Sequence, residues 1–236
     1  MRSVRLKMMT ALGAGLLVVV SIGCQGGMGG SAAPISRPSS PLERRGIEKV
    51  AVVMLNATQN AAVNELEFAQ IFSTELQQFS GVKVFPAAVV EAAVRNNQLV
   101  MPQQAADLGR LLNVDAVMVG FVTTYDSYDT PSVGVLMLVY DVTAKVEEVK
   151  AVEATEETET GTPTEGQADA ALKPIVTLER VYDSDQRWVM ADVEKFARER
   201  GAGDGPLGVR NYTLVMSNYL HFVSDRMIRD LFKSLR

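Results

Sequence analysis

The sequence contains few residues of the types that form disulfides, transition-metal sites or histidine-based centres. Its 236 residues include one cysteine, Cys24, and one histidine, His221. A single cysteine has no internal disulfide partner, and a single histidine excludes a multi-histidine metal site. We therefore expect no metal and no cofactor. We also expect His221, which lies between Leu220 and Phe222, to occupy an ordinary interface or surface position.

The sequence also lacks a cluster of positive charge. It has 23 Lys and Arg residues against 28 Asp and Glu residues, which gives a formal net charge of -5. Backbone phosphates require a basic patch on any protein that binds them. This composition argues against nucleic acid and anionic lipid headgroups as partners, so we expect no nucleic-acid partner.

Only one stretch of the chain is apolar enough to interact with a membrane core. It runs from Met8 to Ile22 and ends just before Cys24. Three cationic residues precede it: Arg2, Arg5 and Lys7. At 15 residues it is shorter than the roughly 20 that a spanning helix needs. A basic start, an apolar centre and a small-residue end are typical of a signal peptide that is removed. We expect residues 1–23 to be that signal.

The end of this run, Ser21-Ile22-Gly23-Cys24, resembles the lipobox of bacterial lipoproteins, with Ser21 where leucine is more usual. The resemblance implies that the mature protein begins at Cys24 and carries palmitate-type acyl chains there, which would fix it to a membrane. Gln25 is not the aspartate of an inner-membrane retention signal, which implies sorting to the outer membrane, facing the periplasm. Cleavage by ordinary signal peptidase near the same point is the alternative.

Two stretches of low complexity divide the rest of the chain. Residues 24–46 are rich in Gly, Ser and Pro and predict a flexible tether. Residues 146–173 are densely acidic and have no aromatic residue, which predicts a disordered loop. What remains has the size of one domain, so we expect a single domain over 47–236 that the acidic insertion interrupts.

Apolar runs and amphipathic stripes predict an α/β fold with one mixed sheet. Strands are expected over 49–55, 82–85, 115–124, 133–143 and 175–182. Helices are expected over 64–79, 87–95, 102–112, 185–200 and 211–235. Helices connect the first three expected strands, and hairpin connections follow later in the chain. This order predicts a sheet of about five strands in the order 2-1-3-4-5, flanked by helices. In the helix over 102–112, we expect Ala105, Leu108 and Leu111 to face inward.

One internal string, ADLGRLLNVDAVMVG from Ala106 to Gly120, combines a helix end, a tight turn and an apolar strand. Together with KVAVVMLNAT at the first strand, it resembles the amino-terminal domain of TolB and the related envelope lipoproteins CsgG, FlgO and LpoB, an activator of penicillin-binding proteins. Asn113 stands where that group more often has glycine, and Asn tolerates the left-handed conformation. The resemblance implies no common enzyme activity. Its members bind envelope partners or assemble into secretion rings.

The CsgG-like alternative meets a physical difficulty in this chain. A barrel-forming protein must contribute amphipathic strands of about nine to eleven residues. The long insertion here is acidic, and the other candidate loop is short. We therefore favour a non-catalytic lipoprotein that binds or scaffolds a periplasmic protein, in the manner of LpoB. A subunit of a secretion or surface-assembly ring, which would be a homo-oligomer, is the alternative.

Two groups of residues could contribute chemistry at strand ends. Asn56 and Thr58 begin the loop after the first strand, where a mixed sheet opens a crevice at a switch point. That crevice is a location for a small ligand.

The second group is a polar aromatic loop formed by Tyr125, Asp126, Tyr128 and Asp129. Its two carboxylates could surround a cation or act as an acid/base pair, as in a small carboxylate enzyme. The alternative is local hydrogen bonding to the backbone of a hairpin loop.

The final helix, 211–235, carries an apolar stripe along its length. Core packing against the sheet is the default interpretation of such a stripe. If the stripe is narrow, Tyr219 and Phe222 remain outside it, and these two residues are then candidates for a partner surface.

Overall fold

The structure of this chain is a computed structural model that describes residues 39–58, 62–128, 130–143, 172–201 and 207–235. The chain divides into two units, 1–36 and 37–236, and the described residues all belong to the second. Cys24, the predicted signal peptide, Asp129 and most of the acidic insertion lie outside the described residues. Within those residues, no helix combines the length and the apolar character needed to cross a membrane.

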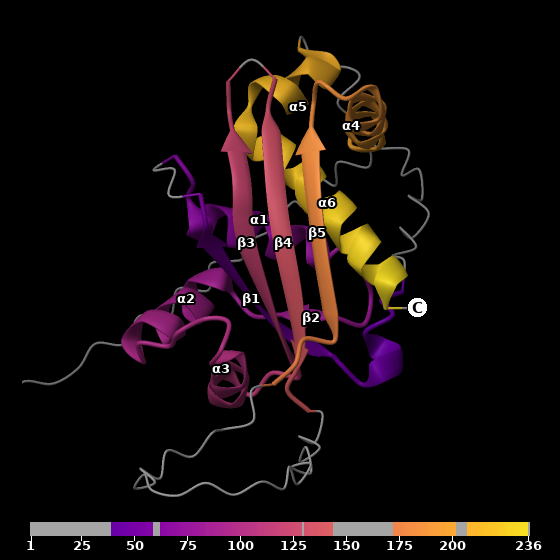
Figure 1. Ribbon diagram of the computed structural model, residues 1–236. Coiled ribbons are helices and arrows are strands. Elements are labelled where there is room, and N and C mark those ends of the chain that lie inside the picture. Colours follow the sequence, from indigo (N-terminus) through magenta and orange to yellow (C-terminus); the bar gives the residue numbers. More distant parts are fainter. Residues whose placement is uncertain (1–38, 59–61, 129, 144–171, 202–206, 236) are drawn as a thin grey trace, which may run out of the picture. The chain divides into compact units, whose positions relative to one another are not determined.

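One mixed five-stranded sheet forms the centre of this unit (Figure 1). Its strands are β1 (Lys49–Asn56), β2 (Lys83–Val84), β3 (Ala116–Asp126), β4 (Ser132–Asp141) and β5 (Val176–Asp183). They lie in the order β2-β1-β3-β4-β5. β1 is parallel to β2 and β3, whereas β4 is antiparallel to β3 and β5. The predicted α/β class and strand order are confirmed.

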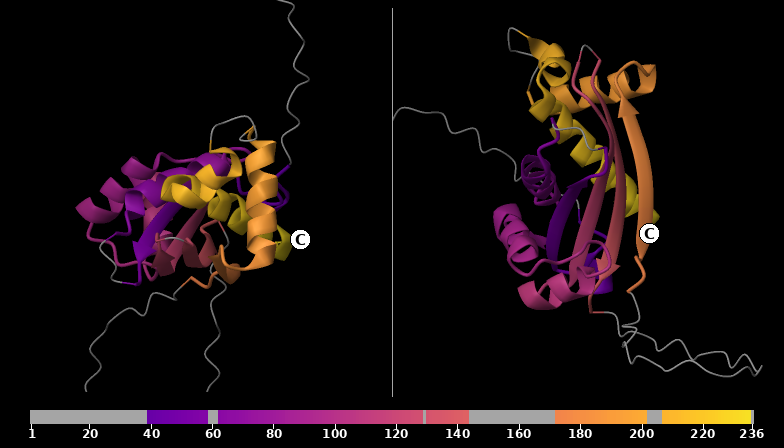
Figure 2. Two further views of the ribbon diagram at one scale, coloured as in Figure 1. Left: turned by 90° about the horizontal axis from the view of Figure 1, so that it is seen from above. Right: turned by 60° about the vertical axis from the view of Figure 1, so that its left-hand side comes forward.

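Helices cover the two faces of the sheet to different extents. The helices are α1 (Glu65–Leu76), α2 (Ala87–Asn96), α3 (Ala105–Leu112), α4 (Arg187–Glu199), α5 (Asn211–Leu214) and α6 (Met216–Ser234). α1, α4 and α6 share a core with four strands on one face. α2 and α3 pack mainly over β1 and β3 on the other face. In Figure 1, α6 crosses behind β4 and β5 with no helix in front of those strands, and Figure 2 shows the strands as one curved sheet.

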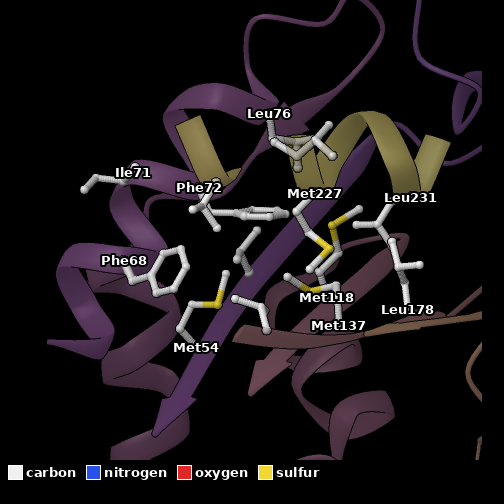
Figure 3. Packing of buried hydrophobic residues seen from close by; sticks show 14 of the residues in the cluster. Met54, Phe68, Ile71, Phe72, Leu76, Met118, Met137, Leu178, Met227 and Leu231 are labelled. Carbon is white, nitrogen blue, oxygen red and sulfur yellow. The ribbon is translucent and has the colours of Figure 1, made fainter. Parts of the chain in front are cut away.

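The larger core lies between the sheet and the helices α1 and α6. Figure 3 shows its packing, with methionines from three strands facing Met227 of α6 and the ring of Phe72 of α1. Methionine is unbranched and adapts its shape to irregular gaps. Gly120 of β3 makes room for one of them, because a Cβ there would lie 2.4 Å from the sulfur of Met54. The continuous apolar run of β1 is explained by this double coverage, since both of its faces are buried.

The string from Ala106 to Gly120 is explained by local structure. Asn113 ends α3 in the left-handed region, with φ 51° and ψ 51°, as expected for a residue in place of glycine. The carboxylate of Asp115 then accepts hydrogen bonds from the backbone N–H groups of Glu48 and Lys49, at 2.9 and 2.8 Å. Asp115 therefore ties the start of β3 to the start of β1, and the string positions the two central strands.

Two helix predictions were partly wrong. α3 begins at Ala105 and buries Ala105, Leu108 and Gly109, which leaves Leu111 half exposed. Gly109 lets the helix approach Val142, because a Cβ at Gly109 would lie 2.4 Å from a Val142 methyl group. In so short a helix, this close contact determines which face is buried. Leu111 does not lie on that face.

The predicted final helix is broken in two at Val215, whose backbone is extended at φ -113° and ψ 109°. The apolar stripe continues across this break, which is why periodicity did not reveal it.

The last part of the predicted tether is folded. Ser39 forms a parallel bridge with Ser80, next to β2, and the Ser40 N–H donates to the Ser80 carbonyl at 3.2 Å. Leu42 is completely buried in the larger core. Residues 39–46 therefore belong to the domain, because one leucine in a polar stretch is enough to dock it.

Candidate functional site

A cleft of about 460 Å³ lies at the open edge of β1. β2 pairs only with Lys49 and Val50, and no other strand of the described residues lies beside the rest of β1 on that edge. α1 and α2 flank the edge instead. The cleft is lined by Val52, Val53, Met54, Leu55, Asn64, Glu65, Leu66, Ala69, Ala87, Val90, Glu91 and Val94.

The backbone of β1 presents hydrogen-bonding groups to this cleft. Successive residues of a strand direct their N–H and C=O groups to opposite edges. The Lys49 carbonyl accepts from Asp115 N at 2.9 Å on the β3 side, and the Val50 carbonyl accepts from Phe85 N at 2.9 Å on the β2 side. By the same alternation, Val52 and Met54 direct their backbone groups toward the open edge.

These outward groups have no partner within the described part of the chain. Neither Val52 nor Met54 takes part in the backbone hydrogen bonds found outside the helices and the strand ladders. Both residues are almost completely buried. Buried backbone groups in folded proteins are nearly always paired, so two adjacent unpaired positions on one edge indicate a place where a ligand can bind.

The mouth of the cleft is acidic. Glu65 is the first residue of α1, and Asn64 caps that helix by accepting from Glu67 N at 3.1 Å. Glu91 of α2 faces the cleft and forms an ion pair with Arg95, one helical turn away. None of the described residues lining the cleft is Lys or Arg. The site is therefore an apolar recess with two carboxylates at its entrance.

Asn56 and Thr58 lie just beyond the cleft and do not line it. The side-chain oxygen of Asn56 accepts from the backbone N–H of Thr58 at 3.0 Å and from its hydroxyl at 2.8 Å. Such a turn closes the end of β1. The residue before it, Leu55, does line the cleft, so the predicted ligand location and the cleft are neighbours along the chain.

The polar aromatic loop lies at the end of β3. Asp126 accepts a hydrogen bond from Tyr128 N at 3.0 Å. This is the local backbone bond of a hairpin loop that we gave as the alternative to a cation-binding or acid/base role. Tyr128 is 82% exposed, whereas Tyr125 packs partly against the larger core. Burial and the charge of Glu67 raise the pKa of Tyr125. Asp129 lies outside the described residues.

Nothing in the described ranges forms a group of three or more His, Cys, Asp or Glu side chains that could hold a metal ion.

Tyr219 and Phe222 differ from the expectation of a partner surface, because both are 0% exposed. The Tyr219 hydroxyl donates to the Tyr182 carbonyl at 3.0 Å. The Phe222 ring meets the rings of Tyr182 and Phe196 at centroid distances of 6.0 and 5.9 Å. α6 is buried over a wide stripe because α1, α4 and the sheet all pack on it.

A buried charged cluster lies away from the cleft. The Glu75 side chain of α1 is completely buried, and both of its oxygens bond to Arg200, just past the end of α4. His221 of α6 places Nδ1 2.6 Å from Glu75 Oε1. A carboxylate only accepts hydrogen bonds, so His221 carries the proton on Nδ1. The cluster connects three helices, and His221 lies where α6 meets α1.

Comparison with protein-family models and with curated protein sequences gives no match for this chain. Solved structures do match. Lipoprotein GNA1162 from Neisseria meningitidis is 17% identical over 65% of this chain and 98% of its own, with a TM-score of 0.42. The hypothetical protein CT253 from Chlamydia trachomatis is 14% identical over 80% and 98%, with a TM-score of 0.44. The LpoB C-terminal domain from Salmonella enterica is 10% identical over 61% and 83%, with a TM-score of 0.36.

Proposed function

We propose that this chain is a lipid-anchored, non-catalytic protein of the bacterial cell envelope whose α/β domain binds a protein partner. Acylated Cys24 holds the chain at the outer membrane, and the segment after it lets the domain reach into the periplasm. The observation that carries the binding role is the cleft at the open edge of β1. It combines apolar walls with unpaired backbone groups, and sites that bind other molecules share this combination.

A membrane anchor is compatible with a binding cleft of modest affinity. A protein held at a membrane needs little affinity to find a neighbour, because tethering raises the effective concentration of the two sites. An open recess in a small domain is consistent with such a role. The exposed Tyr128, on the loop between β3 and β4, is a second candidate contact for a partner.

Site-specific photo-crosslinking in cells tests this function. A photoreactive residue at Val94, which lines the cleft, is expected to give one defined adduct with another envelope protein. Val89 lies on the same helix, is 48% exposed and does not line the cleft, so it is the matched control. We expect no such adduct from Val89.

Two results would count against the proposal. Equal adducts from the two positions would show that the cleft is not the binding site. Adducts between copies of this chain, together with ring-shaped particles of the lipidated protein in negative-stain microscopy, would instead assign the ring-forming alternative.

A further inference from the structure

We propose that the cleft binds an extended peptide segment, which pairs with the open edge of β1 and places a cationic side chain between Glu65 and Glu91. The inference rests on the proposed function and specifies what that function recognises. It follows from the spacing of the backbone groups, from the way β2 ends and from the charge at the mouth.

The backbone spacing selects an extended chain. Val52 and Met54 present one N–H and one C=O group each, two residues apart along the edge. A neighbouring strand offers its own groups at the same two-residue period. Peptides that add a strand to an open sheet edge use this arrangement for affinity.

The end of β2 leaves a place for that strand. β2 pairs with β1 through Val84, and the Phe85 N–H makes one further bond, to Val50. Pro86 then starts the turn into α2, so the chain leaves the sheet at this point. An incoming segment would occupy the strand position beyond the end of β2, beside Val52 to Leu55. That edge is about 13 Å long, enough for a segment of about four residues.

The walls of the cleft fit the side chains of such a segment. Alternate side chains of a strand point to opposite faces. One set would contact Leu66 of α1, and the other would contact Val94 of α2, both of which line the cleft and are partly exposed. The volume of about 460 Å³ is within the range of ligand sites, about 300 to 1,000 Å³. Aliphatic side chains therefore suit both walls.

The charge at the mouth selects a basic peptide over an acidic one. Glu65 and Glu91 line the cleft, and its lining includes no Lys or Arg from the part of the chain that the structure describes. Arg95 pairs with Glu91, but the two side chains are 73% and 39% exposed. Exposed pairs of this kind are weak, so a lysine or arginine of the ligand can share the Glu91 carboxylate. A carboxylate brought to the same place would be repelled.

The inference is tested with two fluorescent peptides and the full-length lipidated protein in detergent micelles. One peptide has four consecutive valines followed by a single lysine, and the other has a single glutamate in place of that lysine. We expect the lysine peptide to bind at least tenfold more tightly in fluorescence anisotropy. We also expect its addition to shift the backbone amide NMR signals of Val52 and Met54 in the same isotopically labelled protein.

Three variants locate the binding. Ala69→Leu fills the cleft and is expected to abolish binding of the lysine peptide. Glu91→Gln is expected to weaken it about fivefold. Glu194→Gln is the matched control, because Glu194 pairs with Arg198 at the same helical spacing on α4. We expect Glu194→Gln to leave the affinity unchanged.

The inference fails if both peptides bind equally, if neither binds, or if Glu194→Gln and Glu91→Gln weaken binding alike. A shift of the Val52 and Met54 signals caused by the detergent alone would point to an acyl chain as the occupant and would also overturn it. The proposed function fails separately. If the Val94 adduct with an envelope protein persists while the peptide results are negative, the cleft binds a partner by another chemistry.

Discussion

Replacing Glu75 by glutamine is expected to lower the free energy of unfolding by about 2 to 4 kcal/mol. Glu75 is completely buried, and its carboxylate bonds to both Arg200 and His221. Removing the negative charge leaves Arg200 without its partner in a partly buried position. The loss is below the full cost for a buried pair, because the Arg200 side chain keeps 35% of its surface in water. Urea unfolding followed by circular dichroism measures the change.

The same cluster predicts a dependence of stability on pH. Burial by itself raises the pKa of the Glu75 carboxyl, but hydrogen bonds with His221 and Arg200, together with the charge of Arg200, bring it below 4.5. A carboxyl with a lowered pKa in the folded state stabilises the fold above its unfolded pKa. That stabilisation is lost as the pH falls from about 4.5 through the lower folded value. Glu75→Gln should lack this component of the acid transition.

An exposed ion pair provides the comparison. Glu194 and Arg198 are separated by one helical turn on α4, and both side chains are about half exposed or more. Glu194→Gln is expected to change the free energy of unfolding by less than about 0.5 kcal/mol. If the two glutamate variants unfold at the same urea concentration, the buried cluster does not stabilise the domain as described.

Replacing Phe222 by alanine is expected to cost about 3 to 5 kcal/mol of stability. Its ring is fully buried and lies within 6.0 Å, between centroids, of the rings of Tyr182, Phe196 and Tyr219. Truncation would leave a cavity between α6, α4 and β5. A thermal or urea unfolding curve of the purified protein gives the value.

Tyr128→Ala is the matched aromatic truncation at the surface. Tyr128 is 82% exposed, so we expect a change within about 0.5 kcal/mol. A Phe222→Ala protein with unchanged stability would restore the earlier interpretation of Phe222 as a surface residue.

The strand order followed from the sequence because local signals determined it. Apolar runs separated by helical stripes required parallel neighbours, and the short polar loop after β3 required a hairpin. The turn at Asn113 was found for the same reason, since its conformation depends on one residue type. These features need no knowledge of distant contacts.

The cleft could not be found in this way. Its existence depends on the chain leaving the sheet at Pro86, where the turn into α2 begins, and on α1 and α2 both lining the edge of β1 beyond that point. The predicted strand over 82–85 would end opposite Ala51 in the observed register, so the sequence pattern does not indicate what lies beside Val52 to Leu55. The burial of Phe222 was missed for a similar reason. Periodicity identifies the centre of an apolar stripe, but its width depends on how many elements pack around the helix.

The central claim is that Cys24 anchors a binding domain to a membrane. Mass spectrometry of the protein purified from the membranes of a bacterium that processes lipoproteins tests it most directly. We expect an amino terminus at Cys24 that carries acyl chains, and we expect the Cys24→Ala protein to be unacylated and recovered in the soluble fraction. A wild-type protein that lacks acyl chains, or a Cys24→Ala protein that is still acylated or held in the membrane, would contradict the account.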